Sequence, residues 1–333
     1  MNEDELVAAI AALTGDAPQV LIGIGDDAAV WQPSRSQRSV ISSDVLVEEV
    51  HFSRAWMTPD DIGWRAMAAN LSDLAAMGAR PRLGTVALGV SSAWTPQALL
   101  ECYGGLARCA RTFGLAIAGG DLSRAPALTI AITVVGEVRP NHCTTRAGAR
   151  AGDVFATTGP LGASRAGLDV ARGAVQLDAP LAARALAAHR TPQPRIAQGR
   201  WLAASAHVHA MMDCSDGLST DLARLARASR VGARVERVPV DEAAEAAAAA
   251  CGVDPAAYAL AGGEDFELLV AVAPRAFEHL SRRFHARFGH RLERIGTARA
   301  DENLVVVNQG REELMVRTGW DHFSASDPGA TGH

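Results

Sequence analysis

Acidic residues recur at the ends of apolar segments along the whole chain of 333 residues. The motifs GDD, SSD, LSD, GGD, MDCSDG and GGED contain Asp26, Asp27, Asp44, Asp73, Asp121, Asp213, Asp216, Glu264 and Asp265. Several follow strand-like runs, which is where α/β sheets build ligand sites. If the carboxylates converge, two of them about 4 Å apart repel by roughly 4 kcal/mol at an effective dielectric constant near 20, so the site needs cations. Mg²⁺ prefers oxygen ligands and substrate phosphates, and the pattern therefore indicates magnesium-dependent phosphate chemistry.

Ordinary structural roles compete with this interpretation. Asp and Gly are common turn residues, so the GDD motif can be a solvated turn. Ser215 and Asp216 can cap a helix that begins near Leu218. Cys214 lies between carboxylates, which should raise its pKa, and we therefore do not expect a nucleophile there. Spacing alone leaves both a converged site and separate turns open.

The absence of lysine excludes several ways of handling nucleotides. All 32 basic residues are arginine. A Walker A loop and a protein kinase both place a lysine on the phosphates, and Schiff-base enzymes need one as well. If the protein binds a nucleotide, it must therefore use metal ions and backbone groups.

Hydrophobic periodicity predicts the elements that position these residues. Helices are expected over 3–14, 64–79, 96–114, from about 163, through Leu218, Leu222 and Leu225, and over 243–250. Strands are expected over 38–45, 82–90, 128–138, 153–159, 208–213 and 266–272. In the helix over 64–79 the apolar residues form one stripe, and Asp73 projects from the opposite side. Strands and helices alternate in both halves, which favours the α/β (α+β) class.

Length and composition favour two domains at roughly 150 residues per domain. The hydrophobic content of 48% and the charged content of 21% are typical of a soluble globular protein. A net charge of −5 offers no basic field for nucleic acid or an anionic membrane. We expect neither a signal peptide nor a transmembrane helix, and five cysteines without a C-x-x-C pair indicate reduced thiols, as in a cytoplasmic protein. A composition shift at 144–153 separates the expected domains, 1–148 and 149–323, and 324–333 should be a frayed tail.

The motifs as a set resemble the thiamine-monophosphate kinase family. They are GIGDDAAV, SSDVLVEEVHF, WRAMAANLSDLAAMGARP, AGGDLS, TTRAGARAGD, TTGPLGASRAGL, MMDCSDGLSTDL, LAGGEDFELL and GWDHF, in order from about residue 20 to residue 323. The resemblance implies a two-domain aminoimidazole ribonucleotide synthetase-like fold, in which N-terminal domains pair in a homodimer across a β-barrel-like sheet. It also implies ATP-dependent phosphorylation of thiamine monophosphate to thiamine diphosphate, the last step of thiamine diphosphate biosynthesis.

The family's site residues carry over by motif. Those implied to surround several Mg²⁺ ions are Asp27, Ser42, Ser43, Asp44, Asp73, Asp121 and Asp213, with a further ion at Asp216. Those implied to bind ATP are Tyr103, Gly120, Asp121, Arg146 and Ser215, and those implied to bind thiamine phosphate are His51, Glu264 and Trp320. No catalytic general base is expected, because a phosphate acceptor is already largely dianionic at neutral pH. Whether K⁺ assists is left open.

Other functions stay as alternatives. A formylglycinamidine cyclase or a selenophosphate synthetase would keep the fold and change the acceptor; GWDHF argues against the first, and the lack of Cys in residues 1–20 argues against the second. A two-metal phosphohydrolase would transfer the phosphate to water, and a regulatory dimer would bind ATP without turnover. Two features depart from the family pattern: Glu49 stands where a small residue is common, and the N-terminal segment is short.

Overall fold

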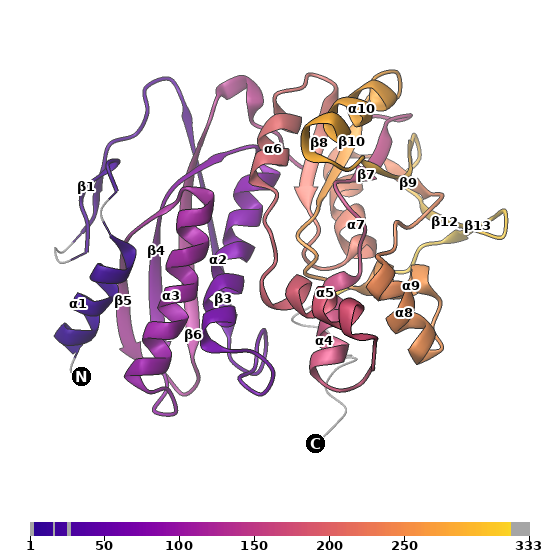
Figure 1. Cartoon of the computed structure of the whole chain (residues 1–333). Coiled ribbons are helices and arrows are strands. Elements are labelled where there is room, and N and C mark those ends of the chain that lie inside the picture. Colours follow the sequence, from indigo (N-terminus) through magenta and orange to yellow (C-terminus); the bar gives the residue numbers. More distant parts are fainter. Residues whose placement is uncertain (1–2, 16, 25–27, 321–333) are drawn as a thin grey trace. The chain divides into compact units, whose positions relative to one another are not determined.

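The computed structural model describes residues 3–15, 17–24 and 28–320 (Figure 1). The chain divides into two compact units. Unit 1 comprises Met1–Cys143 and Arg190–Ala204, and unit 2 comprises Thr144–His189 and Ser205–His333. The division after Cys143 falls at the edge of the expected hinge. Arg190–Ala204 groups with unit 1 although it follows that hinge in sequence.

Unit 1 combines helices with a four-stranded sheet. Its elements are α1 (Glu3–Thr14), β1 (Val20–Ile22), β2 (Val30–Trp31), β3 (Arg38–Val47), α2 (Pro59–Ala76), β4 (Arg80–Val90), α3 (Pro96–Phe113), β5 (Ala116–Arg124), β6 (Thr129–Val138), η1 (Pro140–His142) and α6 (Ile196–Ala203). The strand order of the main sheet is β3-β6-β4-β5, with β6 antiparallel to both neighbours and β4 parallel to β5. The strands β3 and β5 are therefore its opposite edges.

Glycines bring α2 and α3 into backbone contact. A Cβ on Gly63 would lie 1.9 Å from the carbonyl oxygen of Cys102, and one on Gly105 would lie 2.0 Å from that of Asp60. Gly105 thus has a packing reason, whereas a Cβ on its neighbour Gly104 would meet nothing within 4 Å. The helix is present as predicted, with Thr95 as its N-cap and Gly114 as its C-cap.

The expectation for the 64–79 helix was wrong in one respect. Apart from Asp73 and Ala69, nearly every residue of α2 from Ile62 onward is buried, so this is no surface helix with a polar outer side. It packs against β3 and β6 and also against α3 and α6. A helix that packs against neighbours on several sides buries residues around its whole circumference. A single stripe of apolar residues therefore does not identify the face of α2 that contacts the core.

Unit 2 carries a seven-stranded sheet. Its elements are β7 (Val154–Thr157), α4 (Ala163–Ala171), α5 (Ala179–Arg190), β8 (Val208–Asp213), α7 (Leu218–Ser229), β9 (Gly232–Val235), α8 (Glu242–Cys251), α9 (Pro255–Ala261), β10 (Leu268–Val272), α10 (Phe277–Phe288), β11 (Glu293–Arg299), β12 (Leu304–Asn308) and β13 (Arg311–Leu314). The strand order is β13-β12-β9-β11-β7-β10-β8, antiparallel except between β9 and β12. Both units therefore confirm the predicted α/β (α+β) class.

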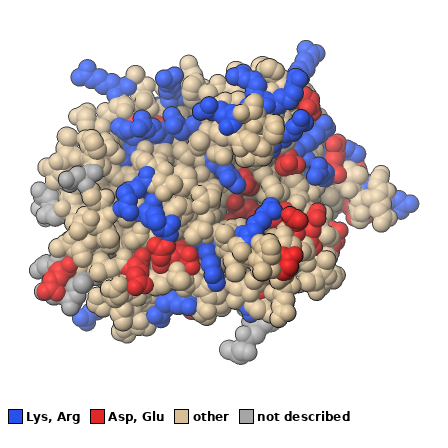
Figure 2. All heavy atoms as spheres, in the orientation of Figure 1, with Lys and Arg blue, Asp and Glu red and all other residues tan. Residues whose placement is uncertain are grey.

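The core of unit 2 explains two of its helices. One apolar cluster lies between the sheet and α7, with Phe155, Met212, Leu222, Leu225 and Leu269 among its buried members. The alanine run forms α8, as predicted, and its small side chains allow close packing against α4. The helix α10 is amphipathic, and basic side chains gather around it at the top of the face in Figure 2. No helix within the described residues is both long and apolar enough to cross a membrane.

Candidate functional site

In unit 2, two acidic motifs meet because their strands are neighbours. Asp213 is the last residue of β8 and pairs with Leu268, the first residue of β10. Beyond the strands, Cys214 N–H donates to the Glu267 carbonyl at 2.7 Å, and Phe266 N–H donates to the Cys214 carbonyl at 2.9 Å. Glu264 N–H donates to the Ser215 carbonyl at 2.7 Å. The MDCSDG and GGED loops are thus joined along their backbones.

A buried carboxylate holds the first of these loops. Asp221, in the first turn of α7, is 0% exposed, and its Oδ2 accepts hydrogen bonds from the backbone N–H groups of Ser215 at 3.0 Å and Asp216 at 2.9 Å. Burial, with the neighbouring Asp216 carboxylate, raises the pKa of Asp221 to about 7. The N-cap of α7 is Gly217, with a φ of 98° and no side-chain cap. The alternative in which Ser215 or Asp216 caps this helix is therefore wrong.

The end of the described chain lies on the same loop. Trp320 N–H donates to the Asp216 carbonyl at 3.0 Å, and Thr318 N–H donates to Ser219 Oγ at 3.2 Å. A Cβ on Gly319 would lie 2.0 Å from the Asp216 carbonyl oxygen, so only glycine allows this approach. The backbone anchors this segment while the Trp320 side chain stays 37% exposed. Five predicted residues of unit 2 therefore lie on connected segments: Asp213, Ser215, Asp216, Glu264 and Trp320.

Arg146 lies apart from that group. Its carbonyl accepts from Ser229 Oγ at 2.9 Å, at the last residue of α7. Ser215 and Asp216 precede the first residue of this 12-residue helix, and a helix of that length spans about 18 Å. The structure thus places the Arg146 backbone at the far end of α7 from Ser215.

In unit 1, α2 and β3 bring a second group together. Ser42 Oγ donates a hydrogen bond to the Asp73 carboxylate, and Asp44 N–H donates to Asn70 Oδ1 at 3.1 Å. Ser43, between them on β3, turns to the other face of the sheet, where its Oγ donates to the Ile132 carbonyl at 3.0 Å. Ser42, Asp44 and Asp73 therefore share the side of the sheet that α2 covers.

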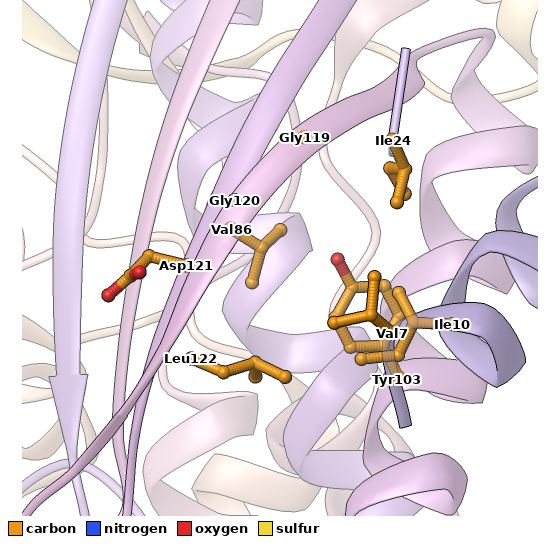
Figure 3. Close-up of a pocket in the computed structure, with 9 residues that line it drawn as sticks. All are labelled: Val7, Ile10, Ile24, Val86, Tyr103, Gly119, Gly120, Asp121 and Leu122. Atoms are coloured by element: carbon orange, nitrogen blue, oxygen red, sulfur yellow. The ribbon is translucent and has the colours of Figure 1, made fainter. Parts of the chain in front are cut away.

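Three of the five residues predicted to bind ATP line a pocket at the other edge of this sheet: Tyr103, Gly120 and Asp121. Tyr103 of α3 and Gly120, Asp121 and Leu122 of β5 border a cavity of about 170 Å³, and Val7 and Ile10 of α1 form its apolar wall (Figure 3). A Cβ on Gly120 would lie 1.9 Å from the Val86 carbonyl oxygen, so glycine lets β5 lie against β4 here. The Asp121 carboxylate points away from Tyr103, to the other side of the strand (Figure 3).

The strand register separates Asp44 from Asp121 within one chain. One row of paired residues runs through Asp44, Ile132, Val86 and Gly120, and the next runs through Val45, Ala131, Ala87 and Asp121. Successive residues of a strand point to opposite faces. Asp44 and Asp121 therefore lie on opposite faces as well as on opposite edge strands, three strand spacings or about 14 Å apart.

The loop that carries His51 is fixed by Glu48. The Glu48 carboxylate accepts from Trp94 Nε1 at 3.0 Å, Leu128 N–H at 3.1 Å and Arg54 Nε at 2.8 Å. Burial alone would raise the pKa of Glu48, yet these donors hold it below its usual range. His51 Nδ1 accepts from Val47 N–H at 3.0 Å. Glu49 adopts a left-handed φ of 63°, which gives a backbone reason for the small residue common at this position.

Sequence reasoning noted Asp265 without giving it a specific role, and it missed the buried Asp221 and Glu267. Asp265 accepts from the N–H groups of Gly162 at 2.7 Å and Ser164 at 3.2 Å, and burial raises its pKa to about 7. Glu267 accepts from Thr158 Oγ1 at 2.5 Å. The available signals were the STDL and GGEDFE segments, whose further acidic residues were given no role. The pKa of Cys214 is raised well above its usual range, first by burial and then by the carboxylates around it, which confirms that prediction.

The donor chemistry of both groups suits Mg²⁺, although no complete metal cage is present. Within residues 3–15, 17–24 and 28–320, no three or more His, Cys, Asp or Glu side chains form a cluster that could hold a metal ion. Mg²⁺ is commonly held by one or two carboxylates together with substrate phosphates and water. Ser42 and Asp73 in unit 1, and Asp213 in unit 2, carry side-chain oxygens of the kind that Mg²⁺ prefers. Asp27, like Asp26, lies outside the described residues.

Comparison with known proteins divides the chain near the same point, although Arg190–Ala204 of unit 1 lies within the second matched domain. Residues 25–138 match the model of the AIR synthase related protein, N-terminal domain, and residues 150–308 match that of the C-terminal domain. Thiamine-monophosphate kinase of Synechococcus elongatus is 44% identical over 309 residues, which cover 90% of this chain and 91% of that protein.

Solved structures agree with this assignment. The crystal structure of thiamine-monophosphate kinase from Stenotrophomonas maltophilia K279a has a TM-score of 0.82 at 32% identity, covering 93% of this chain and 98% of that one. AaThiL complexed with AMPPCP and TMP has a TM-score of 0.77 at 28% identity, covering 88% and 89%. The two-domain aminoimidazole ribonucleotide synthetase-like fold is thereby confirmed, and the chain is an enzyme that belongs to the thiamine-monophosphate kinase family.

Proposed function

We propose that the protein transfers the γ-phosphate of ATP to thiamine monophosphate, giving ADP and thiamine diphosphate in the last step of thiamine diphosphate biosynthesis in the cytoplasm. The observation that carries this proposal is the backbone connection in unit 2. It joins the loop of Asp213, Ser215 and Asp216 to Glu264 on one side and to Trp320 on the other. A metal- and nucleotide-binding loop would thus lie beside residues for the acceptor. The relatives and the complex with AMPPCP and TMP support the same substrates.

The pocket at β5 suits the base of a nucleotide. Its walls are largely apolar, with Val7, Ile10 and Leu122 beside the ring of Tyr103. A flat aromatic base gains from burial against such side chains and from stacking on a tyrosine ring. In this proposal Gly120 lets the backbone approach the nucleotide closely, and Ser215 contributes a phosphate contact. Arg146, whose backbone lies at the far end of α7 from Ser215, is a separate candidate for contact with the nucleotide phosphates.

The oxygen ligands proposed for metal ions in unit 1 are Asp27, Ser42, Ser43, Asp44, Asp73 and Asp121. The ligand proposed in unit 2 is Asp213. Bound Mg²⁺ would supply charge neutralisation between two polyanionic substrates. The protein's own part is to hold the reactants in line, since a dianionic phosphate needs no general base. This assignment explains why a chain without lysine can run phosphate chemistry.

The acceptor would be bound by His51, Glu264 and Trp320. Trp320 is 37% exposed, and the backbone of its segment is anchored to Asp216. A thiazolium cation over a tryptophan ring gains about 0.5–2 kcal/mol. Glu264 adopts a left-handed φ of 63° where the MDCSDG and GGED loops are joined, and this backbone conformation sets the direction of its Cα–Cβ bond.

The separation of Asp44 and Asp121 supports a homodimer. Both are assigned to magnesium, yet one chain places them on opposite edges and faces of the sheet. A second copy whose β5 lies beside β3 would remove the separation between the edges and bring its own Asp121 next to Ser43, the neighbour of Asp44 on β3. The outer face of β3 exposes Ile41 at 68% and Val45 at 49%, and a second sheet would cover them.

Subunit mixing tests this part of the proposal. Asp44→Asn and Asp121→Asn should each be inactive alone. If the metal site combines Asp44 of one copy with Asp121 of the other, a mixed dimer has one intact site and recovers activity. No recovery on mixing, with dimers confirmed by light scattering, would mean that each chain builds its site alone.

The reaction itself is tested by ADP formation with Mg²⁺, with and without K⁺, against a panel of acceptors. We expect ADP and thiamine diphosphate to appear together only when thiamine monophosphate is present. ADP formation without an acceptor would instead indicate a phosphohydrolase. Nucleotide binding without turnover under every acceptor would indicate a regulatory protein.

A further inference from the structure

Arg224 of α7 contacts two carboxylates: that of Asp216, in the loop before α7 that carries proposed metal ligands, and that of Asp221, in the first turn of α7. Its Nη1 donates to Asp221 Oδ1 at 3.0 Å and also to the carboxylate of Asp216. Asp221 is fully buried and fixes the loop backbone, so the guanidinium has one rigid partner. The Arg224 side chain is 33% exposed, which places this charge at the surface of the loop.

The Asp216 carboxylate therefore already has a cation beside it. Family resemblance implies a further Mg²⁺ at Asp216, yet one oxygen of this carboxylate accepts from Arg224. An incoming Mg²⁺ would be repelled by the guanidinium at short range and would have to displace it from Asp216.

The balance of charges around this loop also argues against a Mg²⁺ ion at Asp216. Asp213, at the end of β8, acts electrostatically on Asp221, as does Asp216. When Asp213, Asp216 and Asp221 are all ionised, they and the one guanidinium carry a net charge of two minus, which a single Mg²⁺ neutralises. Without Arg224 the loop would keep an unbalanced carboxylate and attract another cation.

We propose that Arg224 is the built-in counter-cation of Asp216 and takes the place of one Mg²⁺ ion in this chain. It is a positioning residue, because it acts on the loop and not on the substrates. The inference rests on the proposed function only in assigning Asp213 to magnesium. Kinase activity and the number of bound ions can be measured separately.

The test counts Mn²⁺ ions bound per chain by equilibrium dialysis, with saturating AMPPCP as the nucleotide. Wild type, Arg224→Lys and Arg227→Gln should bind the same number. Arg227 is the matched control, since it is an exposed arginine on the same helix. Arg224→Gln should bind one more ion, and its activity should need a higher Mg²⁺ concentration for half-saturation.

Asp216→Asn gives an independent result that does not depend on how Arg224→Gln folds. Under this proposal it leaves the number of bound Mn²⁺ ions unchanged, whereas Asp213→Asn lowers it by one. Loss of one ion in Asp216→Asn, or no gain in a folded Arg224→Gln, would overturn the inference. Absence of thiamine-monophosphate-dependent ADP formation in the wild type would refute the proposed function and leave this count intact.

Discussion

Gly120 offers a direct test of the proposed nucleotide pocket, because an added Cβ on its neighbour Gly119 meets no close contact. A Cβ on Gly120 would stand 1.9 Å from the Val86 carbonyl oxygen, about 1.5 Å inside the start of ordinary contact at 3.4 Å. The obstacle is backbone, so β5 must move away from β4. Overpacking of this kind costs about 1–3 kcal/mol. On Gly119 the nearest atom to an added Cβ is Thr85 Cγ2 at 4.0 Å, and no strain is expected.

Thermal unfolding without nucleotide measures the first effect. At roughly 2–4 °C per kcal/mol for a unit of this size, Gly120→Ala should lower the melting temperature by a few to about ten degrees. Gly119→Ala should stay close to wild type. Because Gly120 lines the pocket, its substitution should also raise the KM for ATP more than the KM for thiamine monophosphate. Equal melting temperatures in the two variants, or an unchanged KM for ATP in Gly120→Ala, would refute this account of the β4–β5 contact.

Three further predictions concern the carboxylates and the acceptor residue. Asp44→Asn and Asp73→Asn should each nearly abolish turnover while the circular dichroism spectrum stays unchanged. At position 73, Asn can still accept the hydrogen bond from Ser42. Wild-type turnover in both variants would exclude a metal role for these residues. Trp320→Ala should raise the KM for thiamine monophosphate more than that for ATP, and the reverse ranking would remove it from the acceptor site. Asp265 has a folded pKa of about 7 against an ordinary value of 3.8, so its stabilising contribution is full below about pH 4 and is lost as pH rises through 7. Asp265→Asn, which does not titrate, should show a smaller decline than wild type in unfolding experiments at pH 5 and pH 8 in EDTA, because Asp221, whose pKa is also about 7, still contributes; an identical decline would contradict the assignment.

Strands with strong local patterns could be predicted from the sequence. The edge strand β5, which contains Gly120 and Asp121, could not. β3, β6 and β8 were expected from their apolar and β-branched residues, and each is present. β5 was missed because its sequence, AIAGGDLSR, holds two glycines and a polar end. Its strand conformation depends on parallel pairing with β4, which is a tertiary effect and leaves little trace in local sequence.

The grouping of site residues shows a similar limit. The acidic motifs were visible in the sequence, but spacing could not reveal which of them meet. The MDCSDG and GGED loops meet because β8 pairs with β10, although some 50 residues separate them along the chain. Asp44 and Asp121 belong to one predicted set, yet the register places them on opposite faces. Asp221 and Arg224 were missed because a buried charge and its partner are recognisable only once burial is known.

The way the unit 2 loops are assembled explains how several acids can be placed together at tolerable cost. The MDCSDG and GGED loops are joined by backbone hydrogen bonds, which the N–H groups of Cys214, Glu264 and Phe266 donate. These three hydrogen bonds use no side-chain carboxylate. Asp221 is the exception: it is buried, and it holds the loop by accepting two backbone N–H groups. Mutual repulsion is reduced by a guanidinium fixed by the fold, since a charge set in place before the ligand arrives needs no reorganisation. In the proposed function, arginine and metal ions therefore supply the positive charges for phosphate binding in a chain without lysine, while backbone hydrogen bonds hold the loops together.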